Sequence, residues 1–190
     1  MLRLLIVPLT RPLILDFIDF IKDEVSTILS KSLGENVEVL IWPSVENPPM
    51  KCFDWDRRQY LGSCIIEWLH SLFHEYTEEY IVVGIGYLDG YEPGLNFIFG
   101  EALPSLKICI VFTKRLNPTF YSLKYDYNLY LQRIVKEVIH ELGHVLGLNH
   151  CTNRRCVMSF SNTIYDVDEK SAYFCDKCIA KIKSYISSTK

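Results

Sequence analysis

The hydrophobic residues of this chain fall into short apolar runs that alternate with longer amphipathic stretches. The short runs predict five strands, over residues 2–9, 37–42, 80–87, 96–102 and 106–113. The longer stretches place an apolar residue at every third or fourth position and predict helices, over residues 12–33, 57–77 and 128–147, with a fourth from about Asp166 to Ser187. Strands that alternate with helices favour a largely parallel sheet.

One connection departs from this alternation. Only a short turn joins the predicted strand 80–87 to the strand 96–102, so the latter should run antiparallel to a neighbour or lie at an edge. The expected fold is therefore α/β, with a twisted, mostly parallel five-stranded sheet, an antiparallel edge strand and packed helices. No repeat, low-complexity tract or linker divides the chain, which predicts a single domain over 1–190, with the sheet and helices in 1–147 and a C-terminal part over 148–190.

Composition and charge narrow the classes of function. The chain is 49% hydrophobic and 23% charged, which is ordinary for a globular protein. A net charge of −3 and a pI near 6.0 give no electrostatic reason to expect nucleic acid or an anionic membrane as a partner. Pro8 and Pro12 interrupt the apolar start of the chain, and no small-residue cleavage site follows, so it indicates a core strand rather than a signal peptide. We therefore expect a cytoplasmic protein.

The stretch HELGHVLGLNH, residues 140–150, carries the clearest chemistry. His140 and His144 are four residues apart, which on a helix places both imidazoles on one face, one turn apart. Both can then bind one metal ion. Glu141 is adjacent and can hold a water molecule near the ion and accept its proton.

His150 defines the kind of metal site. It lies six residues after His144, so on a continuing helix it would point elsewhere. Gly147 stands between them and can adopt the left-handed conformation that ends helices, which lets the chain double back. Three imidazoles leave a fourth position for water, which is typical of a catalytic zinc ion rather than a structural one.

Four of the seven cysteines lie within the last forty residues: Cys151, Cys156, Cys175 and Cys178. In a reducing compartment, cysteines at such short spacing bind metal more often than they form disulfides. Four thiolates make a closed tetrahedral zinc site, which would tie the loop after His150 to the C-terminal helix. Disulfides or free thiols are the alternative. We assign the remaining cysteines, Cys52, Cys64 and Cys109, to packing or to chance.

Several neighbouring residues have an ordinary structural explanation. Met158 can simply fill a gap in the core, or it can form an apolar floor beneath the metal ion. Glu137 shares the helical stripe with the histidines, but a solvated helix charge is the favoured interpretation. His70 and His74 are expected to be exposed or half-buried.

At these positions the sequence resembles a known family. HELGHVLGLNH followed by Met158 resembles the metzincin clan of zinc metallopeptidases, and the four cysteines, with Phe160-Ser161-Asn162 between them, resemble the archaemetzincins. NFIFGEA at 96–102 and RRQY at 57–60 also look like that family's N-terminal half. The resemblance implies a metzincin-like fold and two Zn²⁺ ions per chain. The catalytic ion would be held by His140, His144 and His150, and the structural ion by the four cysteines. Glu141 would be the general base and Met158 part of a Met-turn.

The expected function is hydrolysis of peptide bonds by a zinc-bound water that Glu141 activates, acting on a peptide or protein substrate extended along residues 96–102. Many secreted metzincins carry a blocking pro-segment, whereas this chain begins at its first strand, so we expect no removable inhibitor. The alternative is a zinc-binding protein of low or no peptidase activity that serves as a binding or regulatory module. A zinc-ribbon nucleic-acid binder is disfavoured by the acidic balance and the single CxxC pair.

Overall fold

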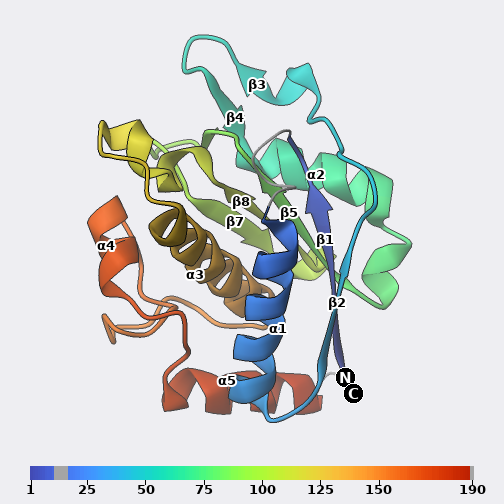
Figure 1. Cartoon of the computed structure of the whole chain (residues 1–190). Helices are drawn as coiled ribbons and strands as arrows, with labels where there is room; N and C mark the ends of the chain where they lie inside the picture. The colour runs from blue at the N-terminus through green and yellow to red at the C-terminus, as the bar shows by residue number, and fades with distance from the viewer. Residues whose placement is uncertain (11–16, 189–190) are drawn as a thin grey trace.

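A five-stranded sheet lies at the centre of the computed structural model, which describes residues 1–10 and 17–188 (Figure 1). Its strands run in the order β2-β1-β5-β8-β7. Their bounds are Val37–Ile41 for β2, Leu2–Pro8 for β1, Ile81–Gly86 for β5, Ile108–Phe112 for β8 and Gly100–Leu103 for β7. The first four strands are parallel, and β7 pairs with β8 in the antiparallel sense. The predicted mostly parallel sheet with an antiparallel edge strand is confirmed, although β7 begins only at Gly100.

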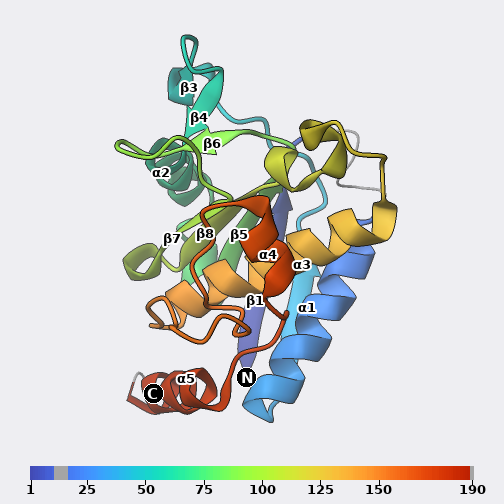
Figure 2. The ribbon, with the colours of Figure 1, turned by 90° about the vertical axis from the view of Figure 1, so that its left-hand side faces the viewer.

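Helices cover both faces of this sheet (Figures 1 and 2). The helices α1, Ile18–Leu33, and α3, Tyr127–Val145, lie on one face, and α2, Gly62–Phe73, lies on the other. Side chains of β1 alternate between the two: Leu4 and Ile6 join the core under α1 and α3, whereas Leu5 and Val7 join the core under α2. A parallel sheet buried on both faces reads as a continuous apolar run, which is why the strands were recognisable in the sequence.

The helix predicted over 57–77 starts too early. Residues before Gly62 supply two strands, β3, Phe53–Asp54, and β4, Gln59–Leu61. With β6, Gly90–Tyr91, they form a small second sheet in the order β3-β4-β6. Its hairpin turn is built by Asp54, whose Oδ1 accepts the backbone N–H groups of Asp56 and Arg57. Turn chemistry therefore overrides the apparent helical pattern at this point.

Two further helix boundaries differ from the sequence prediction. Residues 11–16, where the first helix is expected to begin, lie outside the described residues. Its predicted end at residue 33 is confirmed, and Gly34 follows with a left-handed φ of 74°. The predicted tail helix is divided into α4, Ile164–Glu169, and α5, Asp176–Ser188. A capping box formed by Thr163 and Asp166 starts α4.

Residues 1–10 and 17–188 also contain five short 3₁₀ helices: η1 Met50–Cys52, η2 Tyr76–Glu78, η3 Pro104–Leu106, η4 Lys114–Leu116 and η5 Pro118–Tyr121. Within the described parts of the chain, none of the helices has the length and hydropathy that crossing a bilayer would need.

A disulfide joins Cys52 to Cys64, which corrects the assignment of both residues to packing or chance. It connects η1 to the first turn of α2 and so fastens the small second sheet to the main body. Cys109 is fully buried between the sheet and α3, in agreement with a packing role.

We expect the Cys64→Ser variant to lose about 3 kcal/mol of unfolding free energy, because the disulfide closes a loop and restricts the unfolded chain. Denaturant unfolding with and without reductant measures this loss. Reductant should destabilise the wild type by a similar amount and leave the variant unchanged. Equal stability of wild type and variant without reductant would show that the disulfide contributes nothing.

Candidate metal centre and cleft

The helix α3 places three of the predicted site residues on one face. Asp126 caps its start by accepting the backbone N–H of Leu129 at 2.9 Å. Its apolar face is buried as predicted, through Leu131, Ile134, Val135, Val138, Leu142 and Val145. This packing holds the helix against the sheet and presents His140, Glu141 and His144 to a cavity.

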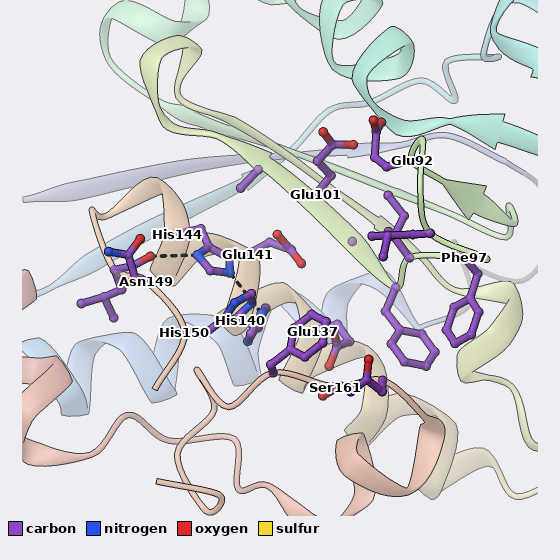
Figure 3. Close-up of a pocket in the computed structure, with 18 of the residues that line it drawn as sticks. Glu92, Phe97, Glu101, Glu137, His140, Glu141, His144, Asn149, His150 and Ser161 are labelled. Atoms are coloured by element: carbon purple, nitrogen blue, oxygen red, sulfur yellow. Dashed lines mark hydrogen bonds between the residues drawn. The ribbon is translucent and has the colours of Figure 1, made fainter. Parts of the chain in front are cut away.

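The chain reverses just after this helix. Gly147 has a left-handed φ of 83°, and the N–H of Leu148 donates to the carbonyl oxygen of Gly143 at 2.9 Å. The reversal brings His150 back to the other two histidines, with its ring centre 5.4 Å from that of His140 and 4.8 Å from that of His144. One ring nitrogen from each of the three lies within 4.8 Å of the others (Figure 3).

The hydrogen bonds of two imidazoles leave their inner nitrogens free to bind a cation. Nδ1 of His140 lies 2.8 Å from the carbonyl oxygen of Val157, and Nδ1 of His144 lies 2.8 Å from that of Leu148. Because a carbonyl can only accept, each Nδ1 carries the proton, and each Nε2 keeps a lone pair. These two Nε2 atoms face one another at 3.2 Å. Two lone pairs at this distance repel, so the donor set fits a metal ion between them.

Burial also favours the neutral form that a metal ligand requires. It lowers the pKa of His140 well below its ordinary value, and the nearby Lys170 ammonium adds to the effect. The pKa values of His144 and His150 are lowered for the same first reason.

Glu141 lies beneath the edge strand. Its side chain is buried, which raises its pKa well above the ordinary value. A Cβ atom on Gly100 of β7 would lie only 2.5 Å from Glu141 Oε1, so only glycine lets the strand approach so closely. The sequence interpretation missed Gly100, although a glycine inside a strand pattern can signal such a close approach.

Met158 is fully buried under α3. A Cβ atom on Gly143 would overlap its sulfur, so the side chain lies directly against the helical turn between His140 and His144. The carbonyl oxygen of Met158 accepts the N–H of Cys151 at 2.8 Å. Met158 thus combines core packing with a position below the histidine cluster.

The four C-terminal cysteines also converge. Their sulfur atoms lie within 4.8 Å of one another, with 3.8 Å between Cys151 and Cys175 and 3.7 Å between Cys156 and Cys178. None of the four is joined to another by a disulfide. Burial opposes ionisation of Cys175, but hydrogen bonds from the Cys178 backbone and from the neighbouring thiols lower its pKa to about 7. This arrangement fits a closed tetrathiolate metal site.

The histidine cluster opens into a cavity of about 650 Å³ between β7 and α3. Phe97, Phe99 and Phe160 supply apolar walls. Figure 3 shows Glu92 and Glu101 on the opposite side of β7 from Glu141. Glu101 is half-buried rather than solvated, and burial together with Glu92 raises its pKa to about 8.

The clearest difference between the structure and the sequence prediction is the burial of Glu137. It was expected to be a solvated helix charge, but only 2% of it is exposed, and its Oε1 lies 2.8 Å from Nζ of Lys170. No local pattern marks Lys170 as its partner, because the two residues meet only when the segment after α4 packs against α3. By contrast, His70 is half-buried and His74 exposed, as predicted.

Comparison with known proteins gives consistent matches. The sequence profile of peptidase family M54 matches residues 14–184. The archaemetzincin of Aeropyrum pernix is 43% identical over 136 residues, or 71% of either chain. The crystal structure of the archaemetzincin of Methanopyrus kandleri superposes with a TM-score of 0.80 at 34% identity, covering 98% of this chain and 96% of that one. A zinc-dependent peptidase from Methanocorpusculum labreanum gives a TM-score of 0.78 at 28% identity, covering 96% and 100%.

The fold and these likenesses define a zinc metallopeptidase. The chain belongs to peptidase family M54, whose named members include the archaemetzincins, as its motifs suggested.

We expect Gly100→Ala to lower peptidase activity by about 100-fold, because the added methyl group would displace the Glu141 carboxyl group. Metal content should be unchanged. Gly34→Ala is the control. The φ of 74° at Gly34 makes the substitution strained, but Gly34 does not line the cavity, so the variant should lose stability and keep its activity. Full activity of Gly100→Ala would show that Glu141 tolerates displacement.

Proposed function

We propose that the protein hydrolyses peptide bonds in the cavity between β7 and α3, with Glu141 as general base. The observation that supports this most directly is the position of the Glu141 carboxyl group, buried beside three neutral imidazoles in a cavity open to substrate. The whole chain, 1–190, would act as one metzincin-like peptidase domain.

His140, His144 and His150 would hold the catalytic zinc ion. When bound there, zinc supplies Lewis acidity that makes water easier to deprotonate and a peptide carbonyl easier to attack. The chain's own contribution is geometric. Val157 and Leu148 fix the tautomers of two ligands through their carbonyl oxygens, and Gly147 returns the third ligand to the cluster.

Glu141 moves the protons of the reaction. Its carboxylate accepts a proton from the attacking water and then donates it to the leaving amine. Burial suits it to this role, because a raised pKa makes the carboxylate a stronger base. Gly100 supports the mechanism by leaving room for the carboxyl group directly under the strand.

The edge strand β7 would bind the substrate backbone. It is the last strand in the order of the main sheet, so one edge of it pairs with no strand among residues 1–10 and 17–188. An extended peptide could add there through main-chain hydrogen bonds, with alternate side chains directed towards and away from α3. Phe97, Phe99 and Phe160 would then offer apolar contacts.

The cysteine cluster would hold a second, structural zinc ion. Its ligands come from both sides of α4, so the ion would join the segment after His150 to the start of α5. This restraint would keep His150 in place, because Cys151 follows it directly.

Glu141→Gln should retain metal at both clusters and lower the rate of peptide hydrolysis by about 10²–10⁴-fold, because the amide cannot accept a proton. Cleavage of an unfolded-peptide library, followed by mass spectrometry, measures it. Unchanged cleavage by the variant would remove Glu141 from its role. Absence of cleavage by zinc-loaded wild type would instead favour the alternative of a zinc-binding module with little activity.

Cys175→Ser should reduce the zinc content from two ions per chain to one and destabilise the segment between α3 and α5, because three thiolates no longer close the site. Elemental analysis together with thermal unfolding tests this. If wild type and variant hold equal amounts of zinc, the cysteine cluster is not a zinc site.

A further inference from the structure

Lys170 is a fully buried cation beside the histidine cluster. Its side chain has 0% exposure, and that of its partner Glu137 has 3%. Nζ lies 2.8 Å from Glu137 Oε1 and 3.5 Å from His140 Nδ1. Replacing a buried ion pair by neutral side chains of similar size is often harmless to stability. The location of this pair, on the ligand helix and against a ligand, therefore suggests a role beyond stability.

The two charges act on the histidine cluster in opposite directions. The Lys170 ammonium lies on the Nδ1 side of His140, whereas Nε2 of that ring faces the other histidines. Because both charged side chains are buried, water screens them little, so this ammonium repels a cation bound at Nε2 and the Glu137 carboxylate attracts it.

We propose that Glu137 and Lys170 are positioning residues whose opposed charges set the affinity of the histidine cluster for its metal ion. Glu137 strengthens binding by neutralising a buried cation, and Lys170 limits it. This rests on the proposed assignment of His140, His144 and His150 as the metal site. The role differs from that of the carbonyl groups at Val157 and Leu148, which orient the ligands but carry no net charge.

A purely mechanical role predicts a different pattern. If the pair only holds the segment after α4 against α3, removing either partner loosens the ligand helix, and both single variants bind metal more weakly. If charge is decisive, the two variants differ: Glu137→Gln leaves an unpaired cation beside the site, whereas Lys170→Met removes the repulsion.

The test is a Co²⁺ titration of metal-free protein carrying Glu137→Gln, Lys170→Met or both changes. Thiolate-to-cobalt charge-transfer absorption reports the cysteine cluster, so the visible bands of the histidine cluster can be followed separately. We expect Glu137→Gln to weaken Co²⁺ binding at the histidines by about 10-fold or more. Lys170→Met should bind Co²⁺ more tightly than wild type, because it removes the repulsion. The double variant should return to within about three-fold of wild type, because it removes the unpaired cation.

Arg133 and Asp168 provide a matched control. They form a second ion pair between α3 and α4, with two contacts of 2.7 Å, but Asp168 does not contact the histidines. Asp168→Asn should lower stability, because it removes the charge that pairs with the buried Arg133 guanidinium, and leave the Co²⁺ affinity of the histidine cluster unchanged.

Binding by Lys170→Met that is no tighter than that of wild type would overturn the inference, as would a double variant as weak as Glu137→Gln; weaker binding by Lys170→Met would favour the mechanical role. If Glu137→Gln does not fold, Lys170→Met decides alone, because the two accounts predict opposite outcomes for it. A wild type that binds no Co²⁺ at the histidines would overturn the proposed function as well, so the two failures are distinguishable.

Discussion

Convergence of the three histidines depends on how α3 ends. A continuous helix could direct only two of the three imidazoles, those of His140 and His144, toward one metal ion. The third, His150, lies six residues after His144 and would face a different direction. Gly147 stops the helix in a left-handed conformation, and the N–H of Leu148 bonds back to Gly143. Leu148 in turn accepts from His144 Nδ1, so the turn that returns His150 also fixes the orientation of the preceding ligand. A single local geometry thus serves two of the three ligands.

The returning segment has to be held, because a loop alone would leave His150 free to move. Met158 anchors it from below by packing against Gly143, and its carbonyl oxygen accepts the N–H of Cys151. Cys151 is the residue after His150 and belongs to the cysteine cluster. The histidine and cysteine clusters are therefore joined by a single peptide bond, and a displacement of Cys151 would also displace His150.

The sequence predicted those features that are encoded locally. Apolar runs marked the buried strands, and the spacing of His140, His144 and Gly147 was sufficient to predict a helix, its end and the reversal, because these depend on residues a few positions apart. The hairpin before α2 was missed because the Asp54 turn competes with a helical pattern that continues on its far side. The disulfide between Cys52 and Cys64 and the contact of Gly100 with Glu141 depend on pairs of elements whose approach no local pattern specifies.

Glu137 shows why burial of a charge is the hardest feature to infer from one chain. Its helical position indicated only that it shares a stripe with His140 and Glu141, and an isolated carboxylate on such a stripe belongs in water. What buries it is Lys170, thirty-three residues later, delivered by the short helix α4. A second ion pair, between Arg133 and Asp168, joins α4 to α3 two residues before Lys170. The metal ligands are therefore surrounded by a charge distribution that depends on tertiary packing of segments on both sides of the histidine turn.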